Sequence, residues 1–155
     1  MIKNRPPRLN EIFQAYACPL FFVTICTLHC RKIGDLKRAH EAFQKYVDRG
    51  TREFGVAVGR YVIMPDHMHF FVCGSPDFEL TQWVNGLKRL ISVELGATKK
   101  TPLWQPGFFD HLLRNDESYG QKWEYVRENP IRAGLVKRTD EWPYQGELVH
   151  IDRAR

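Results

Sequence analysis

The chain has 155 residues, a net charge of +5, and a composition that is 43% hydrophobic and 13% aromatic. These values predict one folded domain over residues 1–155 and exclude a disordered chain. No apolar run approaches the roughly 20 residues of a transmembrane helix, and no apolar signal segment follows the basic start. We therefore expect a cytoplasmic protein without membrane contact, and the excess positive charge suits a polyanionic partner.

The periodicity of apolar residues predicts the elements in chain order. Residues 1–19 form an N-terminal arm, and residues 137–155 form a C-terminal tail that packs back through Trp142-Pro143-Tyr144. Between them we expect strands at 20–28, 56–64, 67–73 and 108–113, and helices at 36–54, 78–95 and 116–129. Asp35 can cap the first helix, Gly59 is a candidate β-bulge, and Pro130 interrupts the last helix before a short continuation that ends at Gly134.

The element order β-α-β-β-α-β, followed by one more helix, predicts an α+β fold of the ferredoxin-like split β-α-β type. Its antiparallel sheet carries two helices on one face. Side chains alternate along a strand, so Met68, Phe70 and Val72 are expected to face those helices, while His67 and His69 face the other side. The additional C-terminal helix, which bears a tyrosine, is the natural cover for that second face.

His67 and His69 lie two residues apart on one strand face. Two neutral imidazoles in this arrangement can chelate a divalent metal ion, with further ligands from elsewhere in the chain. A His-x-His pair on a strand also arises by chance, so the pair alone leaves both interpretations open.

The helix expected at 116–129 presents Tyr119, Trp123 and Val126 as an apolar seam. Tyr125 and Asn129, four residues apart, lie together on a flank of that seam. Taken alone, they are an ordinary half-buried aromatic residue and a helix-end residue before Pro130.

Three segments in this order carry a family resemblance: YVIMPDHMHFFV, WQPGFFDHLLR and YVRENPIRAGLV. Together with VTICT near the start, they resemble the REP-associated tyrosine transposases, which belong to the single-tyrosine HUH transposases of insertion sequences. The resemblance covers roughly residues 21–144. Asp110 and His111 fall in the second segment, and we assign them no chemical role beyond that of strand residues.

The resemblance implies a sequence-specific endonuclease and strand transferase for single-stranded DNA that carries hairpins of palindromic repeats. It implies that His67, His69 and Asn129 bind Mg²⁺ or Mn²⁺, and that Tyr125 is the nucleophile that forms a 5′-phosphotyrosine intermediate. Only a short connector joins Leu113 to the tyrosine helix, which favours a monomer with its site completed within one chain, while a dimer remains the alternative.

Candidate DNA contacts are four basic residues for backbone phosphates and several aromatic residues for base stacking, although core packing also explains each aromatic residue. They are Lys88, Arg89, Lys99 and Lys100, with Phe71, Trp104, Phe108 and Phe109. Two other functions stay open: a metal-dependent nuclease without a covalent intermediate, and a non-catalytic RNA-binding module of ferredoxin-like fold. A protein–DNA adduct that resists SDS separates the three.

Overall fold

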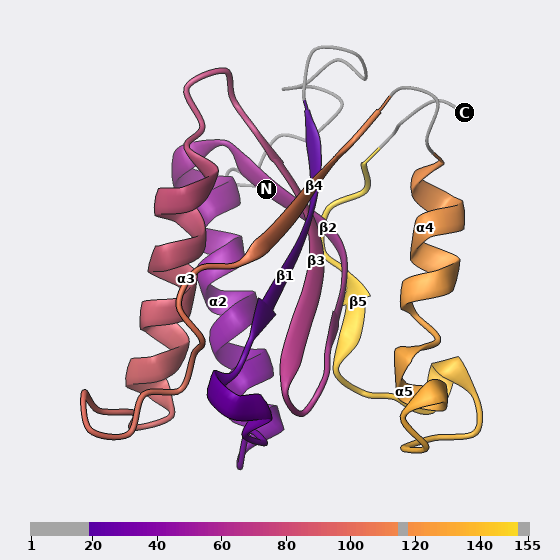
Figure 1. The fold of residues 1–155 in the computed structure, drawn as a ribbon. Coiled ribbons are helices and arrows are strands. Elements are labelled where there is room, and N and C mark those ends of the chain that lie inside the picture. The colour runs from indigo at the N-terminus through magenta and orange to yellow at the C-terminus, as the bar shows by residue number, and fades with distance from the viewer. Residues whose placement is uncertain (1–18, 115–117, 152–155) are drawn as a thin grey trace, which may run out of the picture.

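The computed structural model describes residues 19–114 and 118–151, and Figure 1 shows their arrangement. The strands are β1 (Leu20–Cys26), β2 (Val56–Ile63), β3 (His67–Gly74), β4 (Phe109–Leu113) and β5 (Gln145–Glu147). They form one antiparallel sheet in the order β4-β1-β3-β2-β5. The first four strands have the order of a ferredoxin-like sheet, so the predicted α+β fold is confirmed.

Helices cover both faces of the sheet (Figure 1). Those on one face are α2 (Leu36–Phe54) and α3 (Leu80–Glu94), and those on the other are α4 (Tyr119–Val126) and α5 (Asn129–Arg132). Two 3-10 turns, η1 (Leu28–Cys30) and η2 (Thr139–Glu141), complete the secondary structure. Among the described residues, no helix is both long and apolar enough to cross a lipid bilayer.

Local chemistry sets several of the predicted boundaries. The Asp35 carboxylate accepts a hydrogen bond from the Arg38 amide at 3.0 Å and caps α2. Gly55 ends that helix with a φ of 64°, a conformation that favours glycine. The β2–β3 register shifts between Val58 and Tyr61, which confirms the bulge predicted at Gly59.

The sheet face beneath α2 and α3 is a continuous apolar layer. Met68, Phe70 and Val72 of β3 have no exposed surface and pack in one cluster with residues of both helices. The prediction that these three side chains face the helices is confirmed. Burial of large apolar side chains here, each worth about 1.5–3 kcal/mol, stabilises the sheet.

The opposite face is covered by α4. Tyr119, Trp123 and Val126 are buried against the sheet, and the Tyr119 ring lies 4.7 Å from that of Phe71 between centroids. The predicted seam therefore forms within one chain. The Tyr119 hydroxyl accepts the Arg60 amide at 2.7 Å, directly after the bulge.

Several boundaries differ from the sequence prediction. The first strand ends at Cys26 rather than at residue 28, because His29 and Cys30 adopt left-handed φ values of 54° and 57° in η1. The helix expected at 116–129 starts at Tyr119, where the Ser118 hydroxyl caps it, and ends at Val126. Residues 115–117, expected to open that helix, and the arm up to residue 18 lie outside the described residues.

The C-terminal tail joins the sheet, which the sequence did not predict. Gln145–Glu147 pair with β2 as strand β5. The predicted packing of Trp142 is confirmed, because its ring is buried and its indole nitrogen donates to the Ile63 carbonyl at 3.0 Å.

Candidate active site

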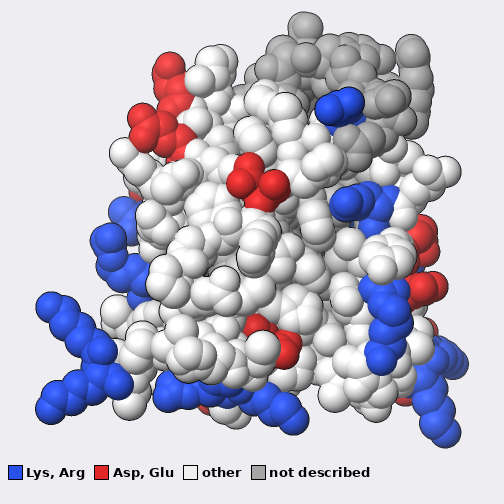
Figure 2. Space-filling model, in the orientation of Figure 1, with Lys and Arg blue, Asp and Glu red and all other residues white. Residues whose placement is uncertain are grey.

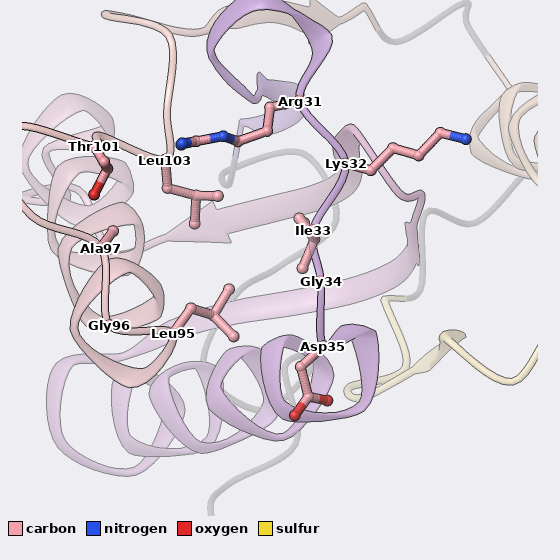
Figure 3. Close-up of a pocket in the computed structure, with 10 residues that line it drawn as sticks. All are labelled: Arg31, Lys32, Ile33, Gly34, Asp35, Leu95, Gly96, Ala97, Thr101 and Leu103. Atoms are coloured by element: carbon pink, nitrogen blue, oxygen red, sulfur yellow. The ribbon is translucent and has the colours of Figure 1, made fainter.

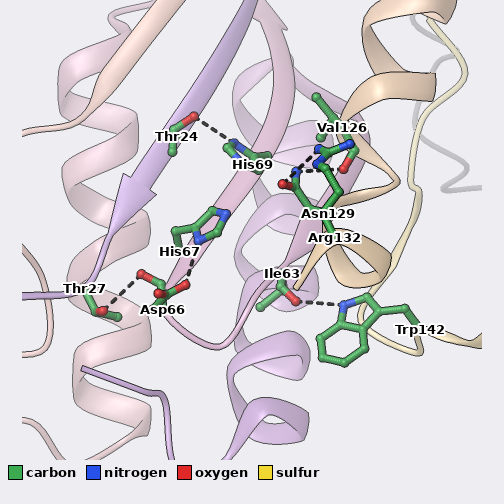
Figure 4. A network of polar contacts seen from close by, with 10 residues as sticks. All are labelled: Thr24, Thr27, Ile63, Asp66, His67, His69, Val126, Asn129, Arg132 and Trp142. Atoms are coloured by element: carbon green, nitrogen blue, oxygen red, sulfur yellow. Dashed lines mark hydrogen bonds and ion pairs between the residues drawn. The ribbon is translucent and has the colours of Figure 1, made fainter. Parts of the chain in front are cut away.

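His67 and His69 lie side by side at the start of β3, on the face that α4 covers only in part (Figure 4). Their ring centroids are 4.7 Å apart, with 75° between the ring planes. Both side chains are half-buried, and the apolar Met68 between them points into the opposite core. The strand therefore holds two imidazoles at short range on one surface.

Each imidazole is oriented through its Nδ1 atom. Nδ1 of His67 lies 2.7 Å from the Asp66 carboxylate, which only accepts, so this nitrogen carries the hydrogen. Nδ1 of His69 lies 2.8 Å from the Thr24 hydroxyl on the neighbouring strand β1. The Asp66 carboxylate thus fixes the His67 tautomer in which Nε2 keeps its lone pair, as second-shell groups of metal-binding histidines do, and the Thr24 hydroxyl, which can donate or accept, orients the His69 ring.

The surroundings of His69 keep it neutral. Its ring stacks on Phe22 at 5.2 Å between centroids, with 19° between the planes. Burial, followed by the positive charges of His67, Arg132 and Lys122, lowers the pKa of His69 from 6.5 to about 3. A neutral imidazole at physiological pH is the form that binds metal ions.

Asn129 is oriented by the break between α4 and α5. Pro130 has no amide hydrogen and cannot donate to the Val126 carbonyl four residues earlier. The Asn129 side chain supplies the missing donor, since its Nδ2 lies 2.8 Å from the Val126 carbonyl. This bond directs the amide oxygen away from the end of α4, where Arg132 donates to it at 3.1 Å.

His67 and Asn129 line one pocket of about 400 Å³. Its wall also includes Asp66 and the side chains of two cations, Lys32 and Arg132. Figure 4 shows Asn129 and Arg132 on the same side of the sheet as the two histidines. The structure therefore brings the predicted third ligand to the histidine strand.

The two tyrosines of α4 have opposite environments. Tyr119 is buried, its hydroxyl is held by the Arg60 amide, and burial raises its pKa far above the ordinary value. Tyr125 is 68% exposed, and the Arg132 guanidinium lies 4.3 Å from its ring centroid. A nucleophile must reach its substrate, so only Tyr125 has a suitable position on this helix.

The donor set of two imidazoles and one amide oxygen can hold a divalent cation. Within residues 19–114 and 118–151, no three His, Cys, Asp or Glu side chains are grouped closely enough to hold a metal ion. A site built on the His67 and His69 pair therefore needs a ligand of another kind, and the Asn129 amide oxygen is one that Mg²⁺ and Mn²⁺ accept. Two imidazoles and one amide leave coordination positions for phosphate oxygens and water.

Three of the predicted DNA contacts lie in the interior instead. Phe71 has no exposed surface and lies under α4, and Trp104 is buried with its indole nitrogen bonded to the Lys88 carbonyl. The Lys88 ammonium is also buried and donates to the Gln105 and Gly107 carbonyls at 2.9 and 2.8 Å. Phe71 has no exposed surface and Trp104 and Lys88 keep only 8% and 9%, so their burial disfavours direct contact with DNA, and their role in DNA binding stays a prediction.

Most of the other candidates are on the surface, whereas Phe108 is half-buried and packs against the core. Arg89, Lys99 and Lys100 are exposed, and Phe109 on the edge strand β4 is 62% exposed. Phe109 pairs with Thr24, the strand position that supports His69. Asp110 and His111 follow it on β4 with exposed side chains, so they are not core residues.

Sequence reasoning missed the residues that support the site. Asp66 and Thr24 orient the two histidines, and Arg132 contacts both Tyr125 and Asn129. A signal existed for Arg132, which follows Asn129 by three positions and Tyr125 by seven, the spacing of one helix face. No local signal points to Thr24, because strand pairing brings it to His69.

A second pocket of about 400 Å³ lies between the start of α2 and the end of α3 (Figure 3). Apolar side chains of Ile33, Leu95 and Leu103 form much of its wall, and Arg31 reaches across it toward the Pro102 carbonyl. Lys32 belongs to the wall of both pockets and points away from this one in Figure 3. A basic side chain thus lies between the two hollows.

Comparison with known proteins gives a consistent family. Residues 16–129 match the family model described as "Transposase IS200 like", a range that includes His67, Tyr125 and Asn129. A REP-associated tyrosine transposase of Escherichia coli strain K12 is 27% identical over 138 residues, which cover 87% of this chain and 79% of that protein. A solved structure of a REP-associated tyrosine transposase bound to a REP hairpin has the same fold, with a TM-score of 0.70 and 23% identity, and the match covers 82% of this chain and 75% of the other.

Proposed function

The chain belongs to the family of IS200-like transposases, enzymes that cut and join DNA, and we propose that it cleaves single-stranded DNA through a covalent bond between Tyr125 and a 5′ phosphate. The observation that carries this proposal is the position of Tyr125. It is exposed on the helix that leads into Asn129, and Asn129 shares a pocket with His67. Arg132 links the two, because its guanidinium lies 4.3 Å from the Tyr125 ring centroid, donates to the Asn129 amide oxygen and lines the same pocket.

The reaction follows from these positions. The Tyr125 hydroxyl oxygen attacks the phosphorus, and its proton passes to solvent on or before attack because a neutral phenol is a weak nucleophile. The bond from phosphorus to the 3′ oxygen breaks, and that oxygen takes a proton. The products are a 5′-phosphotyrosine and a free 3′-hydroxyl. Attack of a 3′-hydroxyl on the phosphotyrosine reverses the step and joins strands without ATP.

His67, His69 and Asn129 are the residues that would hold a divalent ion. When bound, a Mg²⁺ or Mn²⁺ ion neutralises charge on the phosphate and makes its phosphorus easier to attack. Asp66 and Thr24 hold the imidazole rings in place for this task, and the Asn129 amide is held by the Val126 carbonyl. The positively charged side chains of Lys32 and Arg132 in the wall of the pocket suit a phosphodiester, which carries one negative charge.

The proposed substrate is single-stranded DNA with a hairpin of a palindromic repeat, the kind of ligand named for the related solved structure. Surface charge supports a nucleic-acid partner. Lys and Arg side chains gather along the lower margin of the face in Figure 2 and on the side where α4 and α5 lie. Arg89, Lys99, Lys100 and Lys32 are exposed basic residues that a DNA backbone can contact.

We also propose that one chain completes one site, as a monomer. Tyr119, Trp123 and Val126 of α4 are buried against the sheet of their own chain. Asn129 and His67 line the same pocket without a second subunit.

The test is adduct formation with a labelled single-stranded oligonucleotide that carries a hairpin of a palindromic repeat. With Mn²⁺, the wild-type protein should give an SDS-resistant protein–DNA band, and Tyr125→Phe should give none while binding DNA normally. Tyr119→Phe is the matched control and should keep the band. Cleavage without any adduct would favour the metal-dependent nuclease instead.

Mixing two inactive variants tests the monomer proposal. His67→Ala protein retains Tyr125, and Tyr125→Phe protein retains the histidines, so each lacks a different half of the site. A site completed within one chain stays inactive in the mixture. Recovered cleavage would show that the two halves come from different chains.

A further inference from the structure

Arg132 is the residue that connects the parts of the proposed site. Its guanidinium lies over the Tyr125 ring at 4.3 Å, donates to the Tyr125 carbonyl at 2.9 Å and donates to the Asn129 amide oxygen at 3.1 Å. It also lines the pocket that contains His67. One cation thus contacts the proposed nucleophile and the proposed third ligand.

The charge of this guanidinium is only weakly compensated. Its ion-pair partner is Glu128 at 3.5 Å, and both side chains are substantially exposed, at 38% and 57%. Exposed ion pairs of this kind contribute little. Lys32 adds a second cation to the wall of the same pocket. The wall of the pocket that contains His67 therefore carries two cations, Lys32 and Arg132, beside the Asp66 carboxylate.

A dication at His67, His69 and Asn129 and a guanidinium bonded to Asn129 repel each other, because they are like charges at short range. A phosphodiester placed between them removes this repulsion. Guanidinium binds phosphate through two parallel hydrogen bonds, and the ion binds the remaining oxygens. One phosphodiester can therefore bind both the Arg132 guanidinium and the divalent ion.

We propose that Arg132 binds the scissile phosphate and makes metal binding and DNA binding depend on each other. This inference rests on the proposed function and adds a coupling to it. In the absence of DNA, Arg132 weakens metal binding, and with DNA present the two ligands reinforce each other. Because such coupling is reciprocal, metal must raise the affinity for DNA by the same factor, and couplings between sites are typically about 5- to 150-fold.

The experiment measures Mn²⁺ affinity by calorimetry in a Tyr125→Phe background, which prevents cleavage and keeps the ring beneath Arg132. Titrations are made with and without the hairpin oligonucleotide. In the parent protein, DNA should raise Mn²⁺ affinity at least about fivefold. Arg132→Gln should bind Mn²⁺ more tightly than the parent when DNA is absent, and DNA should raise its affinity by a smaller factor.

The expected gain of Mn²⁺ affinity in Arg132→Gln distinguishes phosphate binding by Arg132 from a purely structural role. Loss of a residue that only holds α5 in place would weaken Mn²⁺ binding rather than strengthen it. Arg132→Lys keeps the charge without the planar fork and should bind Mn²⁺ in the absence of DNA as weakly as the parent. An unchanged or reduced Mn²⁺ affinity in Arg132→Gln, with thermal unfolding like that of the parent, would overturn the proposal.

Lys122→Gln is the matched control. Its ammonium lies over the Phe22 ring at 5.1 Å, and Lys122 does not line the pocket with His67. We expect this variant to keep most of the coupling, and an equal loss in both variants would refute the specific role of Arg132. Independent binding of Mn²⁺ and DNA by the parent would refute the coupling alone, whereas absence of any Mn²⁺ binding would refute the proposed function as well.

Discussion

The two faces of the sheet use the same strand for different purposes. On one face of β3, Met68, Phe70 and Val72 are buried along the whole strand beneath α2 and α3. On the other, Phe71 is buried beneath the short helix α4, whereas His69 and His67 emerge beyond its cover. The completely covered face stabilises the sheet, and the partly covered face provides a rigid base for polar chemistry.

The difference shows how a small fold carries a reactive site. The histidines are held rigidly because every second residue of their strand is locked in an apolar core. The helix that carries Tyr125 is attached by three buried residues at one side and leaves the other side open to solvent. The covered face of the sheet fixes the positions of the histidines, and the partly covered face leaves them and Tyr125 accessible to a substrate.

The largest expected effect comes from placing a charge on the covered face. Met68→Asp puts a carboxylate where no surface is exposed, and we expect it to lose more than about 4 kcal/mol of unfolding free energy. Urea unfolding followed by circular dichroism measures this. Val93→Asp, on an exposed position of α3, is the control and should change stability by no more than about 0.5 kcal/mol. A stable Met68→Asp protein would contradict the assignment of the two faces.

A smaller effect is expected where α4 meets the sheet. Tyr119→Phe removes the hydroxyl that accepts the Arg60 amide and leaves that amide without this partner. We expect a loss of about 1–3 kcal/mol of unfolding free energy, with adduct formation retained. Thermal unfolding together with the adduct assay tests both. Loss of the adduct in a folded Tyr119→Phe protein would mean that the two tyrosines have been assigned the wrong roles.

A different kind of effect, a change in pH dependence, is expected on the open face. The pKa of His69 is lowered from 6.5 to about 3, so the unfolded chain binds more protons than the folded one between these values. The contribution of neutral His69 to stability is complete above pH 6.5 and is lost as the pH falls toward 3. In metal-free protein, His69→Asn should show a shallower fall in unfolding free energy across this range.

Urea unfolding from pH 7 to pH 3.5 measures this slope. His150→Asn, which changes an exposed histidine beside Glu147, is the matched control and should keep the wild-type slope. Identical slopes for wild type and His69→Asn would show that the pKa of His69 is not displaced by its position.

Sequence periodicity predicted the fold well because its signals are local. The alternation in β3 assigned Met68 and His69 to opposite faces, and helical spacing identified the seam of α4. β5 was missed because Gln145–Glu147 show no alternation of apolar residues and pair through the backbone with β2. The helix break was placed after Asn129 instead of before it, since the effect of Pro130 falls on the carbonyl of Val126.

The site was only partly predictable for a related reason. A motif identifies His67, His69, Tyr125 and Asn129 as candidates, but it does not show how far α4 extends over the strand. Phe71 shares a face with the histidines and was therefore expected to reach DNA, although the helix buries it. Likewise, the partners of Lys88 are carbonyls of a loop that is 17 and 19 residues away in sequence.

The bulge at Gly59 fixes the height of Tyr125, the proposed nucleophile, above the sheet. The Tyr119 hydroxyl occupies the space where a side chain at position 59 would be, and it bonds to the amide of the next residue. Tyr125 follows six residues later, about 9 Å further along the axis of α4 at 1.5 Å per residue. Moving the bulge by one position along β2 would move the hydrogen bond of the Tyr119 hydroxyl with it. The Tyr125 phenol would then shift relative to the histidines. Gly59 has no side chain and takes no part in the chemistry, but the space that it leaves determines where α4 and therefore Tyr125 lie.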